Sequence, residues 1–352
     1  MLPYWLLFGI FATGAAFYRQ QPDWRNRVSY ALILTALIPI LMVGLRYQVG
    51  ADWDAYMLIY GDLRYRDIFA ALNRSDPAYG LLNWMAHRLG LEIWAVNLAC
   101  AVILIYGLVR FAAFQPNPWL AMVIAIPYFV IVVAMGYTRQ GAAIGLMLVA
   151  FTEISNRSFG KFIFWTVMAG TFHRSAVILL PIVALSYSRN RLLTVALGAV
   201  ATVMGYYFII QPVLDVYISR YSAGSEFESQ GTMIRLAMNF IPGGLYLLFQ
   251  NRFPIDEEER KIWRNLSILA IASLPLYFYL ETSTALDQLA LYMIPLQIFV
   301  LSSIPYVINV GKRQGRMVTI GVILYSAAVQ FVWLNFAGHA SYWLPYRLYP
   351  VF

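Results

Sequence analysis

The sequence is poor in charge and nearly free of cysteine. Only 12% of its 352 residues are charged, about half the usual share in a soluble domain, so a cytosolic enzyme is excluded. A single cysteine, Cys100, leaves no intramolecular disulfide and no cysteine metal cluster, and redox chemistry is not expected. The sequence also lacks a phosphate-binding glycine loop, paired histidine ligands at helical spacing and a nucleophile elbow.

Long apolar runs take the place of the missing charge. Hydrophobic residues make up 61% of the chain, and several runs approach or exceed the roughly 20 residues of a bilayer-spanning helix. These runs are Val28–Leu45, Ile93–Val109, Gln288–Gly311 and Met317–Tyr346. They are apolar on every side, whereas strands of a membrane barrel alternate. We therefore predict an all-α polytopic membrane protein with about 11–12 membrane segments, several of them short or re-entrant.

The basic residues predict the orientation, because short loops rich in lysine and arginine stay in the cytoplasm. The loop 19–27 carries three arginines and is expected inside. The first apolar segment has no basic residue before it, so we expect it to remain in the membrane uncleaved, with the N-terminus outside. Residues 46–92 then form a long outer loop with interfacial helices, and 214–235 a second outer loop. This arrangement places 15 of the 25 basic residues inside and both termini outside, within one integral membrane domain, 1–352.

The segment Phe162–Ser188 is too long for one span and holds His173 and Arg174 at its middle. Both of its flanks are basic. Because a charged pair at the bilayer centre costs several kcal/mol, we predict two short helices that meet at His173 and Arg174 on the outer side. Without this hairpin, everything after residue 175 would invert and most basic residues would turn outward.

All basic residues assigned to the outside are arginines, since the three lysines fall on the inside. A GC-rich genome would produce the same bias toward arginine. Composition alone does not explain why four of these arginines stand at the membrane edges, at positions 46, 139, 174 and 235. A charged residue at a membrane edge is energetically costly and usually functional. A guanidinium binds phosphate or carboxylate through two parallel hydrogen bonds, so these residues are candidates for binding an anion.

Asp52 follows the second span at the start of the long outer loop. Gly50 lets the chain leave the helix, Asp52 can cap a new helix, and Tyr56 follows one turn later on the same face. A helix cap with an interfacial tyrosine is one interpretation; a reactive carboxylate just above the hydrocarbon, near Arg46, is the other. Asp52 and Asp54 could hold a divalent ion only if they faced each other, but Asp54 points about 200° around the same helix. We therefore expect no metal site and no cofactor.

Two further outer segments contain polar groups at helix boundaries. Ser75-Asp76-Pro77 predicts the start of an interfacial helix, on which His87 is expected to be a surface group. Gly136-Tyr137-Thr138-Arg139-Gln140-Gly141 joins two short spans, and its small residues permit close helix packing. Arg139 is expected to face a partner in an outer cavity.

Together these segments resemble the EpsG-type polysaccharide polymerases. The shared motifs occur in the same order: Arg46-Tyr-x-x-Gly-x-Asp52-Trp-x-x-Tyr56, Asp76-Pro-x-Tyr-Gly, Tyr137-x-Arg139-Gln140-Gly-x-Ala143, Phe172-His173-x-Ser-Ala-Val and Trp343-Leu-Pro345-Tyr346. The resemblance covers nearly the whole chain, and the Arg-Gln and Phe-His motifs are its most specific parts. The family commonly shows an arginine where this chain has Asp287-Gln288-Leu289, so its role is either filled elsewhere, by Arg235 or Arg347, or absent.

The resemblance implies a glycosyltransferase-C-like fold and a Wzy-like glycosyltransferase. Such an enzyme extends surface polysaccharides from undecaprenyl-diphosphate-linked repeat units on the outer face of the bacterial cytoplasmic membrane. Its expected partners are the lipid-linked donor and acceptor, membrane lipid, a chain-length regulator and a flippase, and not nucleic acid. Asp52 is the expected catalytic base and His173 the alternative base. The expected substrate-binding residues are Arg46, Tyr56, Tyr137, Arg139, Gln140, Arg174, Arg235 and Tyr346.

Two other functions remain open from the sequence. An O-antigen ligase would use the same donor with a different acceptor and would also carry outer arginines. A flippase for the lipid-linked unit should contain internal repeats and broken helices related by symmetry. We find no repeat, and the asymmetric loop 46–92 argues against one.

Overall fold

The computed structural model describes residues 1–20, 24–179, 203, 231–279, 284–308 and 312–350. The regular elements in these ranges are helical, which confirms the all-α prediction. The chain divides into two compact units, Met1–Ala176 with Asn309–Phe352, and Val177–Ile308. A single integral membrane domain over 1–352 stays a prediction. Most of the expected outer loop 214–235 lies outside the described residues.

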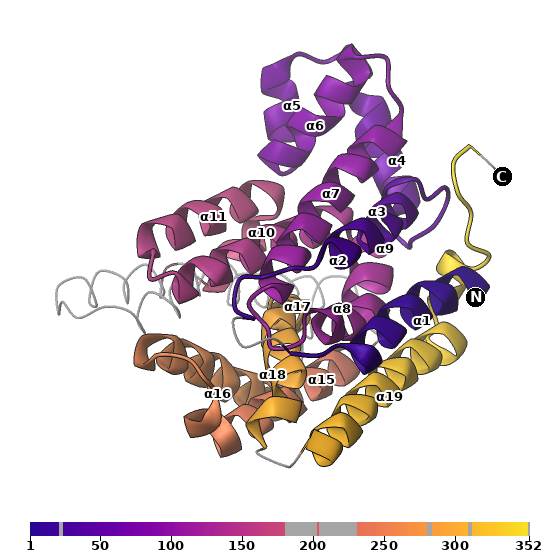
Figure 1. Ribbon diagram of the computed structural model, residues 1–352. Coiled ribbons are helices and arrows are strands. Elements are labelled where there is room, and N and C mark those ends of the chain that lie inside the picture. Colours follow the sequence, from indigo (N-terminus) through magenta and orange to yellow (C-terminus); the bar gives the residue numbers. More distant parts are fainter. Residues whose placement is uncertain (21–23, 180–202, 204–230, 280–283, 309–311, 351–352) are drawn as a thin grey trace. The chain divides into compact units, whose positions relative to one another are not determined.

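The first unit combines helices from both ends of the chain (Figure 1). Its α-helices are α1 (Leu2–Phe17), α2 (Tyr30–Thr35), α3 (Leu37–Gly44), α4 (Trp53–Asp62), α5 (Ile68–Arg74), α6 (Pro77–Arg88), α7 (Ile93–Ala112), α8 (Pro118–Ala125), α9 (Ala134–Gly136), α10 (Thr138–Ser155), α11 (Phe159–Phe172) and α19 (Lys312–Phe336). A π-helix, η2 (Ile126–Val133), joins α8 to α9. The 3₁₀ turns are η1 (Leu63–Tyr65) and η6 (Ala340–Trp343), and a third, η3 (Arg174–Leu179), begins in this unit and ends in the second.

The second unit contains α15 (Thr232–Phe249), η5 (Gln250–Arg252), α16 (Glu257–Tyr279), α17 (Thr284–Tyr292) and α18 (Ile294–Val307). Helix α15 packs against the other three α-helices. Buried amides link these helices: Asn239 Nδ2 donates to the Ala290 carbonyl at 2.9 Å, and Gln297 Nε2 donates to Asn239 Oδ1 at 2.7 Å. Such bonds satisfy polar groups that have no water partner within a bilayer.

Four helices in the described ranges are long and apolar enough to cross a membrane: Ile93–Ala112, Pro118–Gly136, Thr232–Arg252 and Gln314–Phe336. The pair Leu286–Tyr292 and Ile294–Val307, bent by 43°, is a fifth candidate span. The apolar stretches Leu2–Phe17 and Tyr30–Gly44 are shorter. The chain is therefore a multi-pass helical membrane protein that includes short and broken segments, as predicted.

Two boundaries bear directly on the sequence predictions. Helix α11 ends at Phe172 and η3 begins at Arg174, so the expected break at His173 is confirmed; the later part of the predicted hairpin lies outside the described residues. The apolar run Met317–Tyr346 contains a helix long enough to cross a membrane, but α19 ends at Phe336, before the end of the run. The backbone beyond it bonds instead to the loop after α3, including Tyr349 N–H to the Leu45 carbonyl at 2.7 Å.

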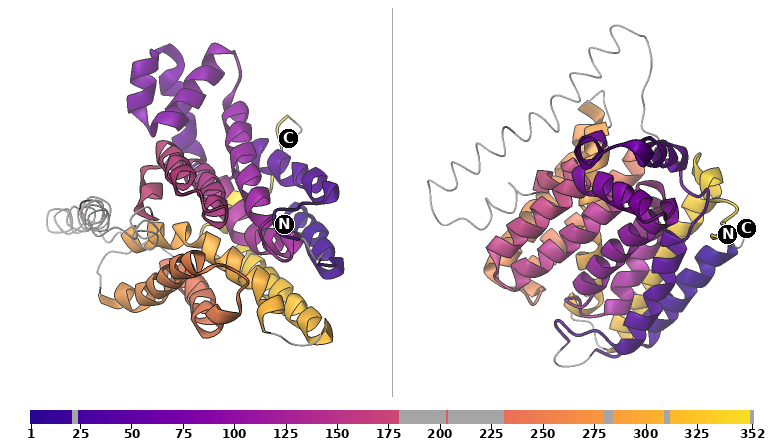
Figure 2. Two further views of the ribbon diagram at one scale, coloured as in Figure 1. Left: turned by 60° about the vertical axis from the view of Figure 1, so that its left-hand side comes forward. Right: turned by 90° about the horizontal axis from the view of Figure 1, so that it is seen from above.

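The two ends of the chain lie side by side in the first unit (Figures 1 and 2). The Tyr4 hydroxyl of α1 donates to the Trp343 carbonyl at 2.8 Å. The orientation of both termini relative to the membrane stays a prediction.

Helices α7 and α10 pack closely because glycines meet at their contact. A Cβ at Gly107 would lie 1.9 Å from the Gly145 carbonyl oxygen, and a Cβ at Gly145 would lie 2.5 Å from the Leu104 Cα. Small residues permit this approach between membrane helices. The contact fixes α10, whose first turn carries Arg139, against α7.

We predict that Gly107→Ala destabilises the protein by about 1–3 kcal/mol, because the added methyl group meets backbone rather than a flexible side chain. Thermal unfolding in detergent measures the effect. Gly9→Ala in α1 is the matched control, since a Cβ there meets nothing within 4 Å, and it should be neutral or slightly stabilising. Equal midpoints for the two variants would contradict the packing argument.

Candidate functional site

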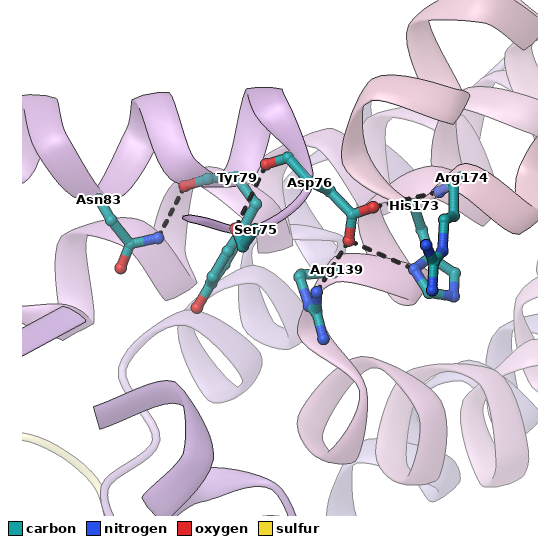
Figure 3. A network of polar contacts seen from close by, with 7 residues as sticks. All are labelled: Ser75, Asp76, Tyr79, Asn83, Arg139, His173 and Arg174. Atoms are coloured by element: carbon teal, nitrogen blue, oxygen red, sulfur yellow. Dashed lines mark hydrogen bonds and ion pairs between the residues drawn. The ribbon is translucent and has the colours of Figure 1, made fainter. Parts of the chain in front are cut away.

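Donors from two segments converge on the carboxylate of Asp76 (Figure 3). Arg139 Nη1 donates to Asp76 Oδ2 at 2.9 Å, and His173 Nδ1 lies 3.5 Å from the same oxygen. The backbone N–H of Arg174 donates to Oδ1 at 3.3 Å. Asp76 precedes α6, Arg139 lies in the first turn of α10, and His173 and Arg174 follow α11. Three parts of the chain that are far apart in sequence thus meet at one carboxylate.

Local structure explains why Asp76 is available for this role. Pro77 occupies the first position of α6 and has no N–H, and the Asp76 side chain makes no capping hydrogen bond. Its carboxylate turns toward α10 and the end of α11 instead (Figure 3). The chain is extended at His173, and the next residue, Arg174, begins a new 3₁₀ turn whose first N–H groups have no partner within the turn.

The surroundings of Asp76 favour its ionised form. The Asp76 side chain is only 10% exposed, against 30% for Arg139 and 18% for His173. Burial alone would raise the pKa of Asp76. The hydrogen bond and charge of His173, the charge of Arg139 and the Arg174 N–H outweigh burial, so this pKa lies below its usual range. Asp76 is therefore a fixed anion that holds its donors in place.

A second carboxylate, Asp52, interacts with the same arginine from the start of α4. The Asp52 side chain makes no capping hydrogen bond. Burial raises its pKa, and the charge of Arg139 opposes this only in part. Tyr56, one turn later, is 4% exposed, and its ring centre lies 5.9 Å from the guanidinium carbon of Arg139. Arg139 therefore contacts Tyr56 and Asp76 and feels the charge of Asp52.

The turn that carries Asp52 is fixed by close backbone contact. Gly50 has φ +109°, and a Cβ there would lie 2.1 Å from the Met135 carbonyl oxygen of α9. A side chain is thus excluded both by the backbone conformation and by the contact. The turn before Asp52 rests on the helix that leads to Arg139.

A comparison with protein families assigns the sequence that forms this site to a known family. The model of the EpsG family matches residues 29–348, a range that includes every residue of the cluster. The chain belongs to the EpsG family. No match to a curated protein or to a solved structure was found. Membership of the EpsG family indicates a polysaccharide polymerase in a membrane, with lipid-linked sugars as the general class of substrate.

In this EpsG-family protein, the Arg139 side chain and the backbone N–H of Arg174 both donate to Asp76, but Arg46 does not join them there. Arg46 is 1% exposed, and the protein itself engages its guanidinium. The four acceptors are the carbonyls of Val43 (2.6 Å) and Val49 (3.2 Å), Asn97 Oδ1 (3.3 Å) and Thr138 Oγ1 (2.7 Å). Thr138 directly precedes Arg139, so Arg46 holds the site from within the fold; its expected contact with substrate stays a prediction.

The other expected substrate-binding residues have varied surroundings. Gln140 is buried, and its Nε2 makes no hydrogen bond among the described residues. Tyr137 is half-buried beside it in sequence. The Tyr346 hydroxyl donates to the Met42 carbonyl at 3.0 Å. Arg235 belongs to the second unit, where its Nε donates to Asp287.

Asp76 was not predicted as a site residue, because its position before Pro77 indicated only the start of a helix. The available signal was its place in the Asp76-Pro-x-Tyr-Gly motif. A serine one residue earlier made capping a sufficient explanation. Its partners stand 63 and 97 positions away, beyond any local pattern.

We predict opposite stability effects for the two carboxylates at pH 7. A lowered pKa means that ionised Asp76 stabilises the fold above its unfolded pKa, and that this stability is lost as the pH falls through the folded pKa. Asp76→Asn should therefore cost about 1–2 kcal/mol at neutral pH, where charged hydrogen bonds to partly exposed partners are removed.

Asp52 has a raised pKa, so its ionised form is penalised in the folded state at neutral pH. Asp52→Asn should therefore leave the thermal midpoint unchanged or higher. Unfolding of both variants in the same detergent at pH 7 makes the comparison, with the exposed Asp54→Asn as the reference. If Asp52→Asn and Asp76→Asn lowered the thermal midpoint equally, the two carboxylates would not have distinct environments.

Proposed function

We propose that this protein is a polysaccharide polymerase that joins undecaprenyl-diphosphate-linked repeat units on the outer face of the bacterial cytoplasmic membrane. One observation carries the proposal: a carboxylate with a raised pKa, Asp52, lies near a cluster of donors formed by Arg139, His173 and Arg174. The pairing of a base with groups that stabilise an anion is what glycosyl transfer from a diphosphate requires.

In the proposed reaction, a hydroxyl of the acceptor unit attacks the anomeric carbon of the donor glycan. A new carbon–oxygen bond forms at that carbon, and its bond to the diphosphate oxygen breaks. The proton of the hydroxyl passes to Asp52, and the electron pair of the broken bond leaves with undecaprenyl diphosphate. A carboxylate with a raised pKa is the better proton acceptor near neutral pH.

The cluster around Asp76 suits the leaving group. Asp76 uses one terminal nitrogen of Arg139, whereas Arg139 Nε is buried and makes no hydrogen bond among the described residues. The side chain of Arg174 is exposed. In its protonated form, His173 can donate from Nδ1 to Asp76 and from Nε2 to a phosphate oxygen. Several charged donors around one diphosphate would stabilise the charge that develops as the bond breaks.

Purified variants in an in vitro polymerisation assay test the base. Asp52→Asn should fold and bind the lipid-linked donor, yet lose roughly 10²- to 10⁴-fold in rate, the usual contribution of a positioned base. Asp54→Asn is the matched control and should keep most activity, because Asp54 is exposed on the same helix. If Asp52→Asn retains activity while His173→Ala binds donor without product, His173 is the base.

Arginine-to-lysine variants test how the diphosphate is held. Arg139→Lys and Arg174→Lys should each lower kcat/KM about tenfold to hundredfold, because lysine keeps the charge but loses the planar pair of donors. Arg64→Lys, at an exposed position of η1, should behave as the wild type. Wild-type rates in both cluster variants would rule out bidentate binding.

The glycan products of cells that lack the protein distinguish the remaining functions. Single-unit glycans indicate a lost polymerase, as we propose. Polymer that is not transferred to its acceptor would indicate a ligase. Accumulation of the inward-facing precursor would indicate a flippase.

A further inference from the structure

We propose that residues 340–349, here called the C-terminal strap, position the catalytic groups, and that Trp343 is the anchor of the strap. The inference concerns turnover and in that respect rests on the proposed function. It arises from contacts that neither the base nor the anion cluster explains.

The strap runs along the loop that follows α3 and forms an antiparallel bridge with it between Arg46 and Leu348. Three backbone hydrogen bonds join the two segments: Gly50 N–H to the Tyr342 carbonyl (2.9 Å), Tyr47 N–H to the Arg347 carbonyl (3.1 Å) and Tyr349 N–H to the Leu45 carbonyl (2.7 Å). Arg347 Nη1 also donates to Gln48 Oε1 at 2.6 Å. The loop that ends two residues before Asp52 is therefore bonded along its length.

Trp343 fixes the strap to the helices. The side chain is 1% exposed, and its Nε1 donates to the Ile131 carbonyl of η2 at 2.8 Å. The carbonyl of Trp343 accepts the Tyr4 hydroxyl at 2.8 Å. The indole also lies against Gly136, where a Cβ would come within 2.8 Å of Trp343 Cζ2 and 3.0 Å of Cη2.

Through these contacts, the strap residue Trp343 links the turn before Asp52 with the helix that leads to Arg139. Gly136 stands three residues before Arg139, and the neighbour of Trp343, Tyr342, bonds to Gly50, two residues before Asp52. Gly50 itself rests on the Met135 carbonyl. A shift of the indole would therefore change how the Asp52 turn sits on the helix that leads to Arg139.

A positioning role predicts a loss of turnover more than of binding. An error of about 1 Å in the placement of reacting groups can cost about 100-fold in rate. In the described part of the chain, the hydrogen bonds of Trp343 go to Tyr4 and Ile131 and not to the anion cluster, so the cluster should be retained when the indole changes. We expect Trp343→Phe to lower kcat roughly 10- to 100-fold with little change in KM.

A double-variant cycle with Gly136 provides the sharpest test. Gly136→Ala should lower kcat because the new methyl group displaces the indole. Phenylalanine has no atoms equivalent to Cζ2 and Cη2, so Gly136→Ala should change kcat little when Trp343→Phe is already present. This coupling would be absent if the two residues acted only on overall stability. Tyr342→Ala is the matched control, because that side chain is 53% exposed and only its backbone bonds to the loop.

A cross-link tests the strap without reference to activity. Gln48→Cys with Arg347→Cys, in a Cys100→Ala background, should form a disulfide on mild oxidation and keep the uncross-linked kcat. Failure of the wild type to polymerise would overturn the proposed function and leave the cross-link result standing. Absence of the disulfide, or wild-type kcat in both Trp343→Phe and Gly136→Ala of an active protein, would overturn the strap.

Discussion

One buried guanidinium ties together the segments on which the candidate site depends. Arg46 bonds to the end of α3, to its own loop, to Asn97 of α7 and to Thr138 of α10. Its hydrogen-bond partners in the described structure are neutral oxygens, an arrangement that costs free energy because a buried charge lacks a counter-charge. The Val43 carbonyl belongs to the last turn of α3, where helix carbonyls have no N–H partner. Arg46 thus satisfies acceptors that a bilayer would leave unpaired.

The two aspartates near Arg139 show how one sequence produces opposite carboxyl environments. Asp76 gains three donors and stays ionised, whereas Asp52 is partly buried beside one cation and holds its proton more readily. Neighbouring titratable groups whose pKa values are driven apart are typical of sites that combine proton transfer with charge stabilisation. In this chain the difference arises from tertiary structure. Both residues precede helices that their side chains do not cap, but only Asp76 receives hydrogen bonds from distant segments of the chain.

Hydropathy and helix signals were sufficient to predict much of the fold. The run Ile93–Val109 corresponds to α7, and the charged pair at His173 correctly marked a break between helices. These features depend on residues within one segment, because each membrane helix must satisfy its own backbone groups. The contact of Trp343 with Ile131, by contrast, joins residues 212 positions apart and leaves no local pattern. Apolar composition alone does not distinguish the C-terminal strap from a membrane-spanning helix.

The burial of Arg46 could not be predicted for a related reason. An arginine at a membrane edge reads as a ligand-binding group, and only the presence of Asn97 and Thr138 at the same point reveals that the fold uses its donors. Membrane-edge position therefore singled out Arg46, but its hydrogen-bond partners within the fold came only from tertiary structure.

The pairing of the strap with the loop after α3 has a consequence for biogenesis. Gln48 and Arg347, which bond to each other, are 299 positions apart, so the ribosome releases one long after the other. Helices from the first half of the chain can enter the bilayer as they are made, but the turn before Asp52 lacks its backbone partners until the strap arrives. Nascent and truncated chains that lack the strap therefore lack the backbone hydrogen bonds that hold the turn before Asp52.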